Sequence, residues 1–496
     1  MENKISRNKF LKLAGLGSIG LYINSCQFAN RSTKDENNSI YANDSAVVSS
    51  ASIDITTSEN VIVHQKGNPE YESLRGGFNK RIQKFPRLIV QCKNTQGIAE
   101  AINYANANKL SVAVKSGGHC FEGFSSNNDG MVINLSLLNA VEWLDNSNVK
   151  IQPGCTLSKL YDELLPKRRI IPAGSCGGVG VGGLTLGGGY GFFSRKYGLT
   201  CDSLIELTLV DGKGNIHHSK DNPELLWACK GGGNGNFGIV SEMIFKTYDA
   251  PAHFTSHRFK ALNVDADRVQ TILEKWFLLT ANLPNSCFSA FVHNGKTLNI
   301  LLTDYENNAN TVQQFKEILT AFVDKVTIGT PKPLATALKN YYGIQYPIYF
   351  KNASAGLYEN YANIQPFIKE VLQKVIDTPG MIYQVNTLGG NINQLSFKDT
   401  SAYPHRAYPY LSELQTYWEK ESQSIKYETA FEEVQSIFSN HHIQTQYRNY
   451  PDINFKNWQQ AYYGENYSRL QQIKKHFDPN NVFGYEQGIQ LITKKK

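Results

Sequence analysis

The sequence predicts an α+β protein with two domains, of which the second is built on an antiparallel sheet. Its 496 residues are enough for two or three domains. Three glycine clusters lie between residues 115 and 240, whereas glycine is sparse after residue 251. Beyond that point amphipathic helical patterns alternate with strand-like runs. We therefore expect a first domain over residues 71–250 and a second over residues 251–445.

The N-terminus is typical of an export signal, expected over residues 1–26. Basic residues precede an apolar run at 13–23 that is too short to span a bilayer. Residues 6–12 resemble a twin-arginine signal, except that Asn8 replaces the second arginine. Residues 23–26 resemble the box at which bacterial lipoproteins are cleaved and lipidated, here on Cys26. An uncleaved N-terminal anchor is the alternative, and in both cases the body is expected outside the cytoplasm, in the periplasm or at the cell surface.

Residues 27–70 are expected to form a disordered tether, because their first half is rich in Asn, Ser, Thr and Asp. The rest of the chain has an ordinary globular composition, 41% hydrophobic and 19% charged. The net charge is +7, and without residues 1–25, which carry +3, it is +4. This charge does not favour a nucleic-acid partner. The eight cysteines form no CxxC pair, so no metal site is indicated.

The first domain is expected to begin with a strand, a helix and a second strand. Apolar spacing predicts strands at 87–91 and 110–114 around a helix at 95–108. Further strands are expected at 131–135, 149–152 and 204–211, and helices at 157–164 and 222–228. In the second domain we expect helices at 266–280 and 311–326 and strands at 288–293, 298–304 and 381–387. Two later helices are expected at 429–438 and 467–477.

The loop KSGGHCFEGFS at 115–125 follows a predicted strand. Main-chain N–H groups at Gly117 and Gly118, with the charge of Lys115 and the hydroxyl of Ser116, suit an anion such as pyrophosphate. His119 comes next. A histidine in a loop is more often structural than functional, but its place beside this cradle makes it a candidate site residue.

The stretch GSCGGVGVGGLTLGGGYG at 174–191 has ten glycines among eighteen residues and apolar spacers. Glycine is required where the main chain lies directly against a ligand, so this run indicates backbone pressed along a large flat molecule. Cys176 would touch that molecule, unless it is a small core residue. A third cluster at 231–240 completes a set that suggests one extended ligand. A dinucleotide-binding pattern at Gly178, Gly180 and Gly183 lacks the helix that should follow it.

Long motifs in a fixed order carry a resemblance to a known family. They are VKSGGHCFEGFS, GSCGGVGVGGLTLGGGYGFFSRKYGLTCDSL, NPELLWACKGGGNGNFGIV, LGGNINQL, TSAYPHR, NYPD, YYGENYSRL and FDPNNVF. On these motifs residues 81–490 resemble the berberine bridge enzyme-like family of flavoproteins, which has a vanillyl-alcohol-oxidase type FAD domain. The resemblance implies a two-domain α+β fold. Its PCMH-type FAD-binding domain would cover 71–250 and its α+β substrate-binding domain, on an antiparallel sheet, 251–445. A C-terminal segment at 446–496 would return to the FAD domain.

The resemblance also implies a bicovalent cofactor. In this family the histidine of SGGH is attached to the flavin 8α-methyl group, and the cysteine of the glycine run is attached to C6. His119 and Cys176 would therefore hold FAD by two bonds. The remaining implied cofactor contacts are Lys115, Ser116, Gly117, Gly118, Val179, Gly180, Gly182, Gly183, Gly238 and Val240.

Family members pass a hydride from an alcohol or amine to flavin N5 while a base removes a proton. In the oligosaccharide oxidases this base is the tyrosine of the NYxD motif, here Tyr450. Relatives pair it with a carboxylate, but this chain has Asn386, which can donate a hydrogen bond and cannot accept the proton. Arg406 or the flavin itself could instead assist the deprotonation of Tyr450. Gln384 and Tyr447 resemble substrate-contacting positions.

Val179 resembles a position where a small residue admits oxygen to the flavin, which favours an oxidase that produces hydrogen peroxide. The leading hypothesis is an exported FAD oxidase that converts the C1 hydroxyl of a sugar or oligosaccharide to a lactone. A second hypothesis replaces the sugar by a secondary metabolite, such as a glycosylated antibiotic or an alkaloid. A third, prompted by Asn386, is a lipid-anchored glycan-binding protein that has lost turnover.

Overall fold

The computed structural model describes residues 55–492, apart from the side chain of Leu395. The expected export signal and Cys26 lie outside the described residues. The tether was expected to reach residue 70, but this boundary is wrong, because residues 61–64 form a strand that pairs with residues 89–92. Within the described residues no helix is both long and apolar enough to cross a membrane.

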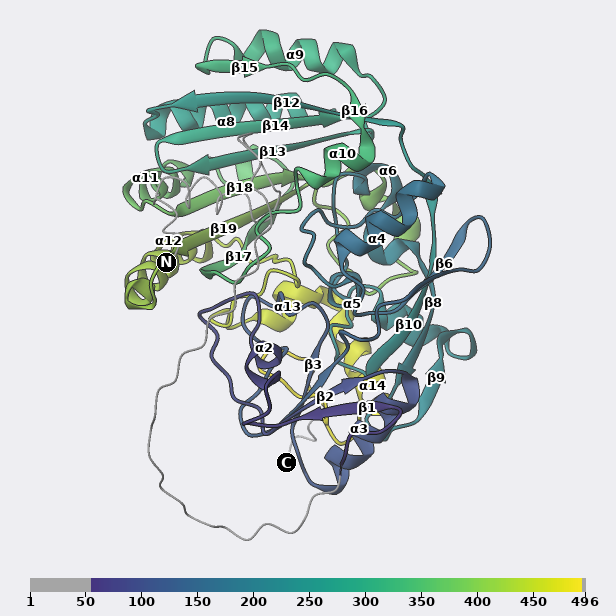
Figure 1. Ribbon diagram of the computed structural model, residues 1–496. Helices are drawn as coiled ribbons and strands as arrows, with labels where there is room; N and C mark the ends of the chain where they lie inside the picture. The colour runs from purple at the N-terminus through teal and green to yellow at the C-terminus, as the bar shows by residue number, and fades with distance from the viewer. Residues whose placement is uncertain (1–54, 493–496) are drawn as a thin grey trace.

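The first domain holds two main sheets (Figure 1). One has the order β1-β2-β4-β3, from β1 (Val61–His64), β2 (Leu88–Cys92), β3 (Val112–Lys115) and β4 (Met131–Asn134). The other is antiparallel, with the order β5-β6-β10-β8-β9, from β5 (Val141–Trp143), β6 (Asn148–Ile151), β8 (Leu204–Val210), β9 (Ile216–His218) and β10 (Ile239–Lys246). A short pair joins β7 (Arg169–Ile170) to β11 (Tyr248–Asp249).

The helices of this domain are mostly short. They are α2 (Tyr71–Arg75), α3 (Thr95–Ala107), α4 (Leu157–Leu164), α5 (Val181–Leu186), α6 (Ser194–Tyr197) and α7 (Pro223–Cys229). Helix α3 begins where the side chain of Asn94 accepts a hydrogen bond from the N–H of Gly97. Helix α5 corrects the expectation that no helix follows the glycine pattern at 178–183. It ends after six residues, at the glycines that begin with Gly187.

The second domain is built on a large antiparallel sheet, as predicted. Its order is β15-β12-β14-β13-β18-β19-β17, with β16 (Lys332–Pro333) paired to β12. The strands are β12 (His253–Leu262), β13 (Cys287–Asn294), β14 (Thr297–Asp304), β15 (Lys325–Thr327), β17 (Tyr349–Tyr358), β18 (Met381–Thr387) and β19 (Tyr410–Trp418). The helices are α8 (Ala266–Thr280), α9 (Ala309–Leu319), α10 (Leu334–Lys339), α11 (Ile368–Asp377) and α12 (Ser424–Asn440). The helix expected to reach residue 326 ends earlier, because residues 325–327 pair with β12.

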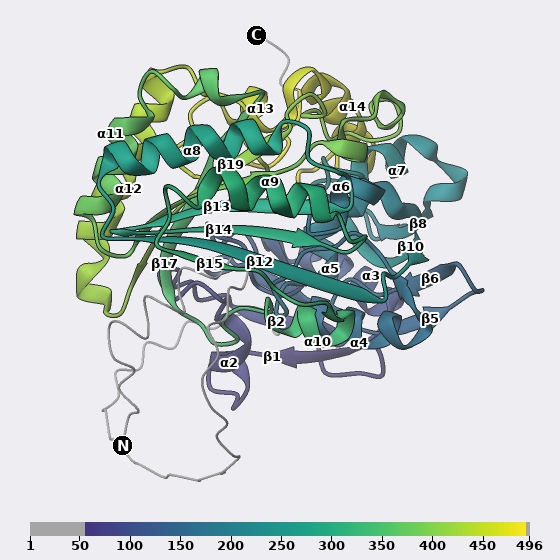
Figure 2. The same cartoon turned by 90° about the horizontal axis from the view of Figure 1, so that it is seen from above.

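Helices α8, α11 and α12 cover one face of this sheet, and the other face is turned toward the first domain (Figures 1 and 2). Side chains alternate between these faces along each strand. On β18, Tyr383 and Val385 join the apolar core beneath the helices. Gln384 and Asn386 therefore lie on the face that is turned toward the first domain.

The C-terminal segment returns to the first domain, with helices α13 (Trp458–Tyr463) and α14 (Tyr467–Phe477). In Figure 1 this yellow segment lies between the two domains and beside the purple and teal sheets. Buried Lys474 donates to the carbonyl of Asn236 and pairs with Asp478. The segment thereby brings the NYPD motif to the junction of the two domains.

Candidate functional site

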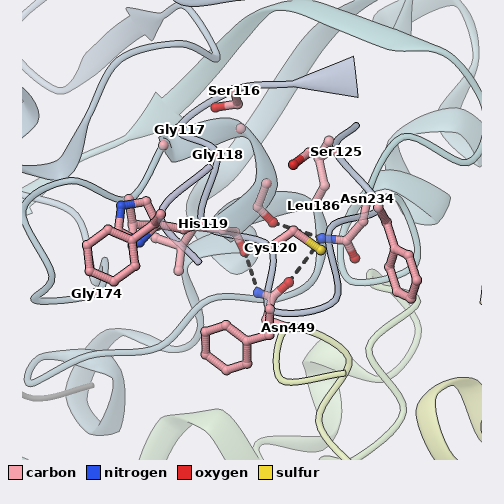
Figure 3. Close-up of a pocket in the computed structure, with 18 of the residues that line it drawn as sticks. Ser116, Gly117, Gly118, His119, Cys120, Ser125, Gly174, Leu186, Asn234 and Asn449 are labelled. Carbon is pink, nitrogen blue, oxygen red and sulfur yellow. Dashed lines mark hydrogen bonds between the residues drawn. The ribbon is translucent and has the colours of Figure 1, made fainter. Parts of the chain in front are cut away.

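A cavity lies where the first domain, the large sheet and the C-terminal segment meet. Most of the predicted site residues line it. These are Ser116, Gly117, Gly118, His119, Cys176, Val179, Gly180, Gly182, Gly183, Gly238, Val240, Tyr447 and Tyr450. Segments far apart in the sequence therefore share one cavity. In Figure 3 the loop with His119 and Cys120, the residue Gly174 and the side chain of Asn449 surround the same space.

The first two glycine clusters cross with their main chains in contact. A Cβ atom on Gly117 would lie 2.3 Å from the nitrogen of Gly180, and one on Gly180 would lie 2.1 Å from Oγ of Ser116. Any side chain at either position would force the loops apart. By contrast, a Cβ atom on Gly183 would meet no atom within 4 Å. Bare main chain thus forms part of the cavity wall, as the glycine run predicts.

His119 is held by stacking, with its ring centroid 4.3 Å from that of Phe78 and the planes 15° apart. Burial lowers the pKa of His119 to about 4. The imidazole is therefore neutral at physiological pH and keeps a free lone pair. A Cβ atom on Gly178 would lie 2.9 Å from Nε2 of His119. The ring thus lies against the glycine run, two residues from Cys176.

The thiol of Cys176 also faces this cavity. Burial raises its pKa to about 11, and the main-chain N–H groups of Gly178 and Val179 partly oppose this shift. One neutral imidazole and one protonated thiol therefore lie along a shared cavity. The structure brings together the two side chains on which the sequence argument for a flavin depends.

Lys115 does not have the place that the sequence predicts. It does not line the main cavity, and its ammonium group donates to the main-chain carbonyls of Leu74 and Gly76. Burial lowers the pKa of Lys115 to about 8. Lys115 ties β3 to the end of α2, so the expected charge for the anion is not supplied from this position.

Tyr450, the predicted catalytic base, lies beside a second tyrosine, Tyr190. The hydroxyl of Tyr450 lies 2.9 Å from that of Tyr190, and Nδ2 of Asn386 donates to the Tyr190 hydroxyl at 3.1 Å. Asn386 therefore contacts Tyr190, and the expectation that it pairs with Tyr450 is wrong. Gln384 donates to Oδ1 of Asn386 at 2.8 Å, and neither residue lines the cavity. Tyr190 and Tyr450 both line it.

The sequence analysis missed Glu413, which is fully buried and is the only carboxylate among the described residues that line the cavity. Strand β19 places Glu413 directly opposite Gln384 on β18. Opposed residues in an antiparallel pair point to the same face, so Glu413 points toward the first domain. Burial first, and then the charge of Glu413, raise the pKa of Tyr190 well above 10.0. The carboxylate near the tyrosines is therefore Glu413 on β19, whereas the sequence comparison expected one on the neighbouring strand β18.

Two family models match the chain. One, described as an FAD-binding domain, matches residues 86–220, and one described as berberine and berberine like matches residues 446–490. The second match includes Tyr450 and the rest of the NYPD motif. The chain therefore carries an FAD-binding domain and a berberine-like C-terminal segment, and its relatives include FAD-linked oxidoreductases and berberine bridge enzyme-like proteins.

Relatives match over most of their length. The FAD-linked oxidoreductase YgaK of Bacillus subtilis is 29% identical over 436 residues, which covers 86% of this chain and 95% of the relative. The glucooligosaccharide oxidase of Sarocladium strictum is 28% identical over 471 residues, with 87% and 92% covered. Among solved structures, a chitooligosaccharide oxidase has a TM-score of 0.78 at 24% identity over 87% of this chain and 98% of its own. The BBE-like 1 protein of Physcomitrella patens has a TM-score of 0.79 at 22% identity, covering 88% and 98%. These two structures show the fold.

The cavity fits FAD, the cofactor of the matched domain. Its walls combine bare glycine backbone with the neutral ring of His119 and the thiol of Cys176. FAD accepts a hydride equivalent when bound, and the protein supplies its orientation and the proton acceptor. Asp202 forms a buried ion pair with Arg406 through two hydrogen bonds. Arg406 is thus engaged with Asp202 and does not assist Tyr450 directly.

An aromatic wall faces the tyrosine pair. Phe121 stacks on Tyr450 with centroids 5.4 Å apart, and Phe121 meets the edge of Phe350 at 5.5 Å. All three side chains line the cavity. Behind them Lys351 donates to Glu122 and, at 2.8 Å, to Asp452. This buried ion cluster joins one residue from each of the three segments that carry the wall.

Proposed function

We propose that the protein is an oxidase that removes a hydride from an alcohol group of a sugar or oligosaccharide, forming a lactone from the C1 hydroxyl. FAD would be the hydride acceptor, and O₂ would be reduced to H₂O₂ as it regenerates oxidised FAD. One observation carries the proposal: Tyr450, Tyr190 and Glu413 line the same cavity as His119 and Cys176. The carbohydrate oxidases among the relatives support the substrate class.

The tyrosine pair would take up the proton of the substrate hydroxyl. Burial, then the neighbouring Tyr190 and the charge of Glu413, raise the pKa of Tyr450 well above 10.0. A tyrosine with so high a pKa is protonated at neutral pH. It can accept the proton of the substrate hydroxyl only if it gives its own proton to another group at the same time. Glu413 is the carboxyl group beside the pair that can receive it. We therefore assign Tyr450 as the group that contacts the substrate hydroxyl and Glu413 as the acceptor.

His119 and Cys176 would hold FAD through two covalent bonds. The neutral imidazole is a competent nucleophile, whereas the thiol must lose its proton first. The test is acid denaturation followed by separation of protein from free flavin. We expect flavin absorbance to stay with the parent protein and to be lost from the His119→Ala/Cys176→Ala variant. Flavin that stays with the double variant would exclude these attachment sites.

A secondary metabolite with an aromatic or apolar alcohol is a second candidate substrate. The wall formed by Phe121 and Phe350 favours it. The deciding experiment is a panel of sugars, oligosaccharides and aryl alcohols with peroxide detection, and Tyr450→Phe protein as the control. Peroxide from sugars alone supports the first candidate, and peroxide from aryl alcohols alone supports the second. Bound flavin that no substrate in the panel reduces would instead support a binding protein without turnover.

We further propose that the protein is exported and lipidated on Cys26. The support is the basic and apolar pattern of residues 1–26. Cells grown with a labelled fatty acid should give labelled protein in the membrane fraction. The Cys26→Ala variant should lack the label, and its retention would refute lipidation at this residue.

A further inference from the structure

Arg448 is a buried cation without a carboxylate partner. Only 4% of the residue is exposed, and it lines the cavity. Its Nε donates to the hydroxyl of Tyr463 and its Nη2 donates to that of Tyr485, both at 2.8 Å. No ion pair between residues 55 and 492 includes it. Its only described hydrogen-bond partners are therefore neutral.

Three other buried cations in the described chain have different partners. Arg406 pairs with Asp202 and Lys474 with Asp478. Arg195 donates to the main-chain carbonyls of Leu388 and Leu283. Against this pattern, a guanidinium group that faces a cavity and has only phenol partners is an exception.

Aromatic rings account for only part of the stabilisation of Arg448. Its guanidinium carbon lies 5.8 Å from the ring centroid of Phe124, 5.5 Å from that of Tyr462 and 5.6 Å from that of Tyr485. Each such contact is weak compared with the cost of burying an uncompensated charge. The arrangement therefore calls for an anion in the cavity.

We propose that Arg448 provides the positive charge that binds the diphosphate of FAD. The diphosphate is the permanent anion of this cofactor, and Lys115 is bonded to carbonyls outside the main cavity. Among the Asp, Glu, Lys and Arg residues of the described chain, only Glu413 and Arg448 line the cavity, and the charge of Glu413 would repel a phosphate. Arg448 also packs on Phe124, which belongs to the same loop as Gly117 and Gly118, the glycines predicted to bind an anion. This inference rests on FAD binding and is independent of the proposed substrate.

The test separates the diphosphate from the ring of the cofactor. Arg448→Met would be made in the His119→Ala/Cys176→Ala background, so that flavin binding is reversible, and flavin-free protein would be titrated with FAD and with riboflavin, which lacks phosphate. We expect Arg448→Met to weaken FAD binding by about 10- to 100-fold, as loss of a charge-assisted bond does, and to leave riboflavin binding unchanged. Arg469→Met, which removes an exposed arginine paired with Glu224, is the matched control.

Three outcomes would overturn the assignment. Equal weakening of FAD and riboflavin would mean that Arg448 only shapes the cavity. Unchanged FAD affinity would mean that it binds no phosphate. A lower flavin reduction potential with unchanged FAD affinity would place its charge beside the reduced ring.

Two further variants cover the case in which Arg448→Met fails to fold. Arg448→Gln removes the charge with less change in polarity, and Arg448→Lys retains it. We expect the preference for FAD over riboflavin to fall in the glutamine variant and to persist in the lysine variant. Tyr463→Phe removes a hydroxyl partner without changing the charge, and it should keep the preference. An equal preference in the glutamine and lysine variants would contradict the proposal.

Discussion

The hydroxyl groups of Tyr190 and Tyr450 lie 2.9 Å apart in the cavity, although 260 residues separate them in the sequence. Asn386 donates to the Tyr190 oxygen, which leaves the Tyr190 proton free to be donated to Tyr450. Either hydroxyl can be the donor in this hydrogen bond, and Tyr190 adds to the effect of burial in raising the pKa of Tyr450. The amide of Asn386 thus supports the tyrosine pair through orientation, although it cannot accept a proton.

The first prediction distinguishes the two tyrosines. Tyr450→Phe should slow flavin reduction by about 10²- to 10⁴-fold, the usual contribution of a general base. Tyr190→Phe should slow it by about tenfold, because it removes one hydrogen bond from the base. Stopped-flow absorbance of the flavin measures both. Tyr349→Phe, outside the cavity, is the control. A larger loss in Tyr190→Phe than in Tyr450→Phe would make Tyr190 the base.

The second prediction concerns Glu413. Glu413→Gln should slow flavin reduction by about 100-fold at neutral pH, and the rate should recover as pH rises, because hydroxide can then take up the proton. Adding Asn386→Asp restores a carboxylate on the same face of the sheet, and we expect it to recover part of the rate at neutral pH. The pH dependence of flavin reduction is the measurement. A profile like that of the parent would exclude Glu413 as the acceptor.

The third prediction concerns the ion cluster behind the aromatic wall. Lys351→Met leaves Asp452 buried without a cation, while Glu122 keeps its ion pair with Arg81, so it should lower the free energy of unfolding by about 3–5 kcal/mol. Lys351→Met/Asp452→Asn removes one charge of each sign and should be less destabilised. Urea denaturation measures both variants.

The control for the ion cluster is Lys374→Met, which breaks an exposed pair with Glu433 and should cost under about 1 kcal/mol. If the double variant loses as much free energy of unfolding as Lys351→Met, or more, then Lys351 and Asp452 do not stabilise each other, and the prediction is wrong.

The fourth prediction follows from His293, which is fully buried on β13. Burial lowers its pKa to about 4, against about 6.5 in the unfolded chain. As pH falls below about 6.5 the unfolded state binds a proton first, so stability is lost between about pH 6.5 and 4. The loss is at most about 3 kcal/mol. His293→Leu should reduce the difference in urea midpoint between pH 7.5 and 4.5, whereas the exposed control His253→Leu should not. An unchanged difference in His293→Leu would contradict this.

Much of the fold follows from local pattern. The apolar spacing of residues 95–108 and 266–280 and the alternation at 381–387 match α3, α8 and β18 closely. The errors concern two short strands. Residues 61–64, placed in a tether, pair with β2, and residues 325 and 326, placed at the end of a helix, pair with β12. The run Val-Ile-Val at 61–63 does favour a strand, whereas the segment at 325–327 is too short to indicate its pairing.

By itself, the sequence determined where bare main chain, His119 and Cys176 occur, because each lies in a continuous motif whose chemistry is local. The tertiary structure alone decided that Lys115 is bonded elsewhere, that Tyr190 lies between Asn386 and Tyr450, and that Glu413 faces Gln384. The physical reason is that charge compensation and proton transfer act through space over a few ångströms. Strand pairing and the return of the C-terminal segment set those distances between residues that are far apart in the chain.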